Sequence, residues 1–95
     1  MKVTFHRLAE IELIATARNL NAEARLGLAF LATYEVWESQ IRRFPLSCPE
    51  IAPGIRCGYL KRFKYHITYQ ILPDAIRILY VRHARQAPLK RLGRV

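Results

Sequence analysis

Residues 65–83 read YHITYQILPDAIRILYVRH, and this stretch decides the fold. Its first part alternates between apolar and polar side chains, which is the pattern of a half-buried strand. Leu72 to Ala75 predicts a turn, because the proline and the aspartate that it contains favour turn conformations. Ile76 to His83 is rich in Ile, Leu, Val and Tyr and predicts a second strand. Two strands joined by so short a turn predict an antiparallel hairpin.

Further strands flank this hairpin on both sides. Ile55 to Phe63 predicts a strand that extends the hairpin into a meander, and Lys2 to Phe5 predicts a short first strand. Residues 45–54 hold three prolines and a glycine, so they predict a loop. That loop is too short to separate two domains, and we expect one domain, residues 1–95.

Two helices are predicted between the first strand and the loop. Leu8 to Leu20 has apolar residues at helical spacing. Asn19 to Asn21 predicts the break, with Asn21 as the N-cap of the next helix, which runs from about Ala22 to Arg43. That second helix carries a stripe of large apolar residues at helical spacing: Phe30, Tyr34, Trp37, Ile41 and Phe44.

The predicted order of elements is β-α-α-β-β-β. Helices joined by a short break pack as an antiparallel hairpin, and no other element is available to cover the apolar face of the sheet. The predicted fold class is therefore α+β, with a two-helix hairpin packed on one face of a mainly antiparallel four-stranded sheet.

The positive charge is concentrated in the second half of the chain. Residues 51–95 carry ten Lys or Arg and one acid, whereas residues 1–50 carry six of each, so the net charge of +9 belongs to the strands and the tail. A basic sheet predicts a polyanionic or acidic partner, such as nucleic acid, a ribosome, a nucleic-acid enzyme or an acidic protein.

The composition also sets limits on location and chemistry. No apolar stretch reaches the roughly 20 residues that a membrane span requires, and residues 1–7 lack a secretion signal, so we expect a cytoplasmic protein without a membrane partner. Cys48 and Cys57 are expected to be reduced thiols. The histidines are too scattered for a zinc site, and we expect neither a metal nor a cofactor.

Basic residues are expected around the sheet face that points away from the helices. Alternation places His66, Thr68 and Gln70 on that face. Basic side chains around a concave surface attract phosphates or carboxylates, although they can also simply solvate an edge and a turn. The predicted target-binding residues are Arg56, Lys61, Arg62, Lys64, Arg77, Lys90 and Arg91.

Two histidines, His66 and His83, are the candidate proton-transfer groups of this face, because imidazole titrates near neutral pH. No nucleophile or carboxylate is predicted beside either of them, and a lone histidine on a strand more often has a structural role. A nuclease site, if the chain has one, would consist of His66, His83, Arg82 and Arg85.

Four segments together resemble the RelE/ParE superfamily, the toxins of type II toxin–antitoxin pairs. They are VTFHRLAEIEL at 3–13, IRRFP at 41–45, RFKYHITYQI at 62–71 and IRILYVRHAR at 76–85. The resemblance implies one of two activities. RelE-like members cleave mRNA on the ribosome without a metal, using Lys and Arg to stabilise the charged phosphate, and ParE-like members poison DNA gyrase.

The sequence departs from the nuclease pattern of that superfamily. The two lysines expected on the second strand fall at Cys57 and Tyr59, and the arginine expected on the third falls at His66. The arginine expected after the last strand falls at Arg85 or Gln86, and the C-terminal tyrosine has no counterpart. Each missing donor would cost about 3 kcal/mol of transition-state stabilisation. These departures favour the ParE-like activity.

The resemblance also implies a cognate antitoxin with an acidic, partly disordered C-terminal segment. Such a segment would lay a helix into a groove of the helical hairpin and continue towards the basic sheet. Three hypotheses remain open: a toxin that binds DNA gyrase, a ribosome-dependent endoribonuclease with an altered basic and histidine site, and a plain nucleic-acid-binding module.

Overall fold

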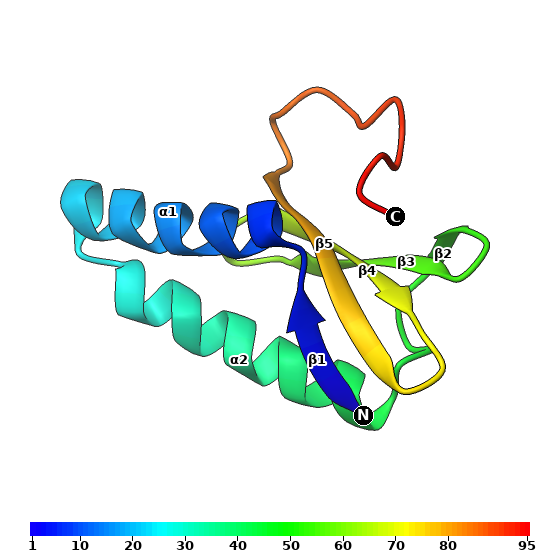
Figure 1. Ribbon diagram of the computed structural model, residues 1–95. Coiled ribbons are helices and arrows are strands. Elements are labelled where there is room, and N and C mark those ends of the chain that lie inside the picture. The colour runs from blue at the N-terminus through cyan, green and yellow to red at the C-terminus, as the bar shows by residue number, and fades with distance from the viewer.

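The computed structural model covers residues 1–95 and contains two helices and five strands (Figure 1). In chain order these are β1 (Lys2–Phe5), α1 (Arg7–Ala24), α2 (Gly27–Arg43), β2 (Glu50–Ala52), β3 (Ile55–Leu60), β4 (Tyr65–Ile71) and β5 (Ala75–His83). The strands form one sheet in the order β1-β5-β4-β3-β2. The β1 strand is parallel to β5, and all other neighbours are antiparallel. The predicted α+β class and the helical hairpin are confirmed.

The sheet has one strand more than predicted. The short β2 strand forms inside residues 45–54, where the prolines predict only a loop. Its formation depends on Gly54, which adopts a positive φ of 74° that a tight turn requires. The turn brings β2 antiparallel to β3, and the Cys57 amide donates to the Pro49 carbonyl at 3.0 Å.

The break between the helices lies later than the asparagines predict. The α1 helix continues through Asn21 to Ala24 and ends at Arg25, which adopts the left-handed conformation with φ 55°. The Arg25 amide donates to the Asn21 carbonyl, and the Leu26 amide donates to the Leu20 carbonyl, which closes the helix end. The predicted break at residues 19–21 is therefore wrong by about one turn.

The core fills the space between the hairpin and the sheet. Four residues of the predicted α2 stripe are buried there, and only Phe44, which follows the end of α2, is exposed. Gly58 of β3 lies directly under Trp37, and a Cβ at this position would overlap the indole ring. The main buried residues of the core are Phe30, Tyr34, Trp37, Ile41, Ile67, Tyr69, Ile76 and Ile78.

A bulge in β5 decides which side chains share a face. The pairing of β4 with β5 shifts after Thr68 and leaves Leu79 as an extra residue in β5. Because side chains alternate along a strand, one extra residue reverses the face of every residue that follows. Arg82 therefore shares a face with its direct partner His66, whereas His83 turns to the opposite face.

The tail after β5 folds back onto the sheet instead of fraying. Figure 1 shows the chain turning back after the end of β5, so that the C-terminus lies near the sheet. Leu89 and Leu92 of the tail pack against a second, smaller core made by Ile55, Leu79 and Tyr80. Neither helix is long and apolar enough to cross a membrane.

Candidate functional site

The sheet face away from the helices, which we call the open face, carries a cluster of polar side chains from β3 and β4. The Cys57 Sγ lies 3.8 Å from the Nδ1 of His66 and 3.8 Å from the hydroxyl of Thr68. The ring of Tyr59 packs on the imidazole of His66 with centroids 4.7 Å apart. Burial raises the pKa of the Cys57 thiol, so this group stays protonated and uncharged at neutral pH.

The tail, residues 84–95, forms a wall above the open face, and we call it the strap. Arg82 links the two, because its guanidinium donates to the Ala87 carbonyl at 2.7 Å. Between the strap and the face lies a cavity of about 670 Å³. The residues that line it from the sheet side are Ile51, Cys57, His66, Thr68, Arg82 and His83, and those from the strap side are mainly residues 86–92.

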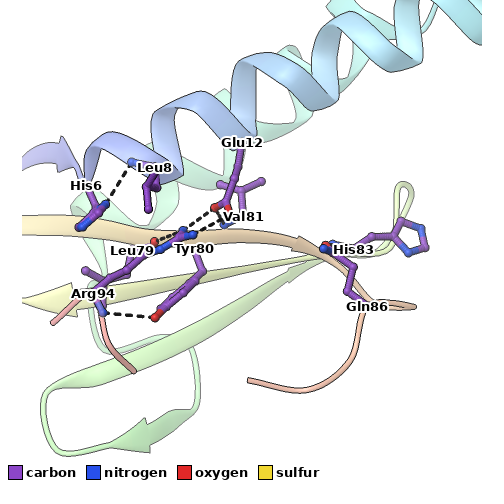
Figure 2. Close-up of polar contacts among 9 residues, drawn as sticks. All are labelled: His6, Leu8, Glu12, Leu79, Tyr80, Val81, His83, Gln86 and Arg94. Atoms are coloured by element: carbon purple, nitrogen blue, oxygen red, sulfur yellow. Dashed lines mark hydrogen bonds and ion pairs between the residues drawn. The ribbon is translucent and has the colours of Figure 1, made fainter. Parts of the chain in front are cut away.

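The end of the strap is held by one arginine. Arg94 donates to both carboxylate oxygens of Glu12 at 2.7 and 3.0 Å and to the Leu79 carbonyl at 2.9 Å (Figure 2). Its guanidinium also lies 4.2 Å from the centre of the Tyr80 ring. The Val81 amide donates to the same carboxylate at 3.1 Å. These contacts join α1, β5 and the C-terminus in one place.

The two candidate histidines do not share a face. His66 lies on the open face, whereas the ring of His83 packs edge-on against Tyr65 on the helix side, with centroids 5.1 Å apart. The Nδ1 of His83 accepts a hydrogen bond from the Arg85 amide, so the imidazole shapes the turn after β5. Of the predicted nuclease set, only His66 and Arg82 are directly paired on the open face. His83 also lines the cavity, and Arg85 is exposed in the turn.

The predicted target-binding residues occupy four different places. Arg56 points to the helix side and donates to the Leu46 and Cys48 carbonyls at 3.1 and 2.6 Å, so it holds the loop that precedes β2. It does not line the open face, contrary to the prediction that it surrounds one concave surface. The remaining residues are exposed or half-buried: Lys61, Arg62 and Lys64 in the β3–β4 turn, Arg77 on β5, and Lys90 and Arg91 on the strap.

The Lys61–Lys64 turn and the start of the strap are neighbours. The Ala84 amide donates to the Lys64 carbonyl at 2.7 Å, which places Arg85 at the same end of the sheet as the basic turn. This end therefore presents a cationic surface, while Arg82 is the one Lys or Arg that lines the cavity from the sheet side. Such an arrangement can attract an acidic chain at the rim and accept polar or apolar groups inside.

Sequence reasoning missed the residues that hold the strap. In the sequence, Glu12 looks like an ordinary helix acid and Arg94 like one more tail cation, because the two partners are 82 positions apart. The only local signal is the pair Leu89 and Leu92, apolar residues in a basic tail. Both cysteines are free thiols, and no group of three His, Cys, Asp or Glu side chains lies close enough to hold a metal ion.

Comparison with known proteins gives a structural likeness only. No protein-family model matches the sequence, and no curated protein matches it. Among solved structures, the chain is similar to one described as "Chromosomal ParDE TA system from P. aeruginosa". The TM-score is 0.65 at 18% identity, over 90% of this chain and 97% of that chain. The chain therefore has the fold of a ParDE-system protein.

Proposed function

We infer that the chain is the toxin of a type II toxin–antitoxin system and that it is ParE-like, inhibiting growth by binding DNA gyrase. The observation that carries this proposal is the likeness to a ParDE-system chain along almost the whole length of both proteins. The floor of the cavity supports the ParE-like over the RelE-like activity, because Arg82 is the only Lys or Arg that lines it from the sheet. Cys57, Tyr59 and His66 stand where a nuclease of this superfamily would present cations to the scissile phosphate.

The partner of the toxin is an antitoxin with an acidic C-terminal segment. The hairpin supports this role, because it leaves large apolar residues exposed on α1 (Ile11 and Ile14) and on α2 (Leu28 and Val36). A depression of about 480 Å³ lies where the two helices join, lined in part by Ala17, Gly27 and Leu31. An amphipathic helix suits such a surface, and acidic residues around it would complement the net charge of +9.

The second candidate is a ribosome-dependent endoribonuclease. It is favoured by one contact of the sheet, the direct pairing of His66 with Arg82 on the open face. This pair would supply a proton-transfer group beside a guanidinium that stabilises charge. If this activity exists, His66→Ala would abolish mRNA cleavage, while His83→Ala, which changes a ring on the other face, would leave cleavage intact.

Induction of the chain without an antitoxin tests the proposal. Cells are examined in parallel for mRNA cleavage and for the DNA-damage response. DNA damage with intact mRNA is the expected outcome. Cut mRNA with undamaged DNA would contradict the gyrase proposal and support the endoribonuclease. The variant Lys61→Ala/Arg62→Ala/Lys64→Ala should lose toxicity, because it removes the cationic turn. Arg18→Ala/Arg25→Ala/Arg43→Ala, which removes three exposed cations from the helical hairpin, is the matched control.

A further inference from the structure

The strap covers apolar surface that the sheet alone would leave open to water. With the strap in place, Ile55, Leu79 and Tyr80 are 4%, 0% and 6% exposed, and the strap leucines pack on them. These three residues lie on the face that the helices do not cover. Departure of the strap would therefore expose an apolar patch and, beside it, the cavity with Cys57 and His66.

The strap is also connected to a free sheet edge. The β1 strand pairs with β5 only as far as Ile78, and the His6 amide then donates to the Ile78 carbonyl. Beyond this point the outer edge of β5 has no neighbouring strand. Side chains form hydrogen bonds with its backbone instead (Figure 2). Arg94 donates to the Leu79 carbonyl, the Glu12 carboxylate accepts from the Val81 amide, and the Gln86 side-chain oxygen accepts from the His83 amide.

We propose that the strap is a releasable cover of the open face, that the Glu12–Arg94 ion pair is its latch, and that an acidic, apolar polypeptide segment replaces it. The latch is the strongest hold on the strap, because Arg94 makes a forked contact with the carboxylate, and both side chains are partly buried at 17% and 27% exposure. The choice of an acidic partner rests on the proposed function, whereas the latch itself does not.

The chemistry under the strap favours a polypeptide over a nucleic acid. A replacement for the strap has to cover Leu79 and Tyr80 again, which apolar side chains do and a phosphate backbone does not. It also meets the Leu79 carbonyl and the His83 amide, which lose Arg94 and Gln86 when the strap leaves and which an extended chain can pair. Arg82, released from the Ala87 carbonyl, would then donate to a carboxylate of the replacing segment.

Cys57 reports strap release directly, because it lines the cavity beneath the strap. In a Cys48→Ser background, it is the only thiol, and its rate of modification by a small thiol reagent measures opening. Arg94→Gln and Glu12→Gln should each raise this rate about tenfold, the effect of losing a charged hydrogen bond. Arg43→Gln and Glu23→Gln, which remove the same charges from exposed helix positions, should leave it unchanged.

A second background separates strap release from general loosening. With Cys57→Ser, the remaining thiol is Cys48, which packs against the core on the helix side. Its modification rate should not respond to Arg94→Gln. An equal rise in the modification rate of both thiols, or no rise in that of Cys57, would contradict the proposed latch.

Binding of a short synthetic peptide of Glu and Leu identifies the partner class. Arg94→Gln lowers the net charge of the protein and Glu12→Gln raises it, so simple electrostatics predicts opposite effects on an acidic ligand. The latch predicts that both variants bind the peptide about tenfold more tightly. A gain for a single-stranded oligonucleotide instead would overturn the assignment to a polypeptide. The thiol and peptide measurements test the latch, and induction of the chain in cells tests the proposed function. If the first two give the expected results but induction damages neither DNA nor mRNA, the latch is supported and the proposed function is wrong.

Discussion

One imidazole nitrogen closes the start of α1. His6 is the N-cap, and its Nδ1 accepts a hydrogen bond from the Leu8 amide at 3.1 Å. Only the neutral imidazole can accept this bond. Desolvation lowers the pKa of His6 below its ordinary 6.5, and the cations of Arg77, Arg94 and Arg7 act in the same direction, against the smaller opposite effect of Glu12.

The lowered pKa of His6 predicts a protein that loses stability in mild acid. Below pH 6.5 the unfolded chain binds a proton at His6 that the folded chain resists, so the free energy of unfolding falls as the pH falls towards the lowered value. Above pH 6.5 the stabilisation is fully present. His6→Asn keeps a capping oxygen and does not titrate, so it should flatten the dependence between pH 7 and 5 in urea unfolding.

The control for this prediction is His66→Asn, which removes an exposed imidazole from the open face and leaves the helix start intact. It should retain the full pH dependence. A His6→Asn protein with an unchanged slope would assign the acid sensitivity to another group.

At the scale of elements, one close approach sets the geometry of the helical hairpin. Gly27 begins α2 against α1, and a Cβ added there would lie 2.5 Å from the Ala17 carbonyl oxygen and 2.8 Å from the Asn21 Cβ. Contacts this short force backbone to move. Gly27→Ala should therefore lower the free energy of unfolding by about 1–3 kcal/mol, as overpacking does.

The matched control is Gly93→Ala, because a Cβ added at Gly93 would meet nothing within 4 Å. Its effect should stay within about 0.5 kcal/mol in the same chemical unfolding experiment. Equal effects of the two substitutions would mean that the helices can separate at Gly27 without cost.

The same hairpin shows what the sequence predicts and what it does not. The helices and the main strands can be predicted from local periodicity, because the apolar residues of each buried face recur at regular spacing in the sequence. The break between the helices does not, because Arg25 adopts a left-handed conformation that its residue type does not favour. The β2 strand is not predicted either, because the three residues between Pro49 and Pro53 are too few to show an alternating pattern.

The candidate site depends on longer-range geometry. Strict alternation through β5 would place His83 on the same face as Arg77, and therefore beside His66. The bulge at Leu79 reverses this, and no glycine or proline in β5 marks its position in the sequence. The strap is hardest to foresee, because Arg94 finds Glu12 at the other end of the chain. Contacts of this kind exist only in the folded molecule.

At the scale of the whole molecule, charge repulsion should limit stability. Sixteen Lys and Arg face seven acids, and the structure contains three salt bridges. The molecule extends 38 by 29 by 23 Å, and at about 0.01 M salt the Debye length is about 30 Å. Most cations then repel one another across the entire fold. At about 0.15 M the Debye length is about 8 Å, so only near neighbours interact.

Added sodium chloride should therefore raise the Tm of the free chain, while it weakens the complex with an acidic partner. Relief of about 1 kcal/mol of repulsion corresponds to about 4–8 °C for a domain of this size. Reversing two exposed charges, Lys61→Glu and Arg62→Glu, should reduce both effects, since it lowers the repulsion and the attraction together. Thermal unfolding at several salt concentrations, with and without the acidic peptide, measures the salt dependence of the Tm and of peptide binding in one experiment. A free chain that salt destabilises would show that its few ion pairs, above all Glu12–Arg94, outweigh the repulsion among its cations.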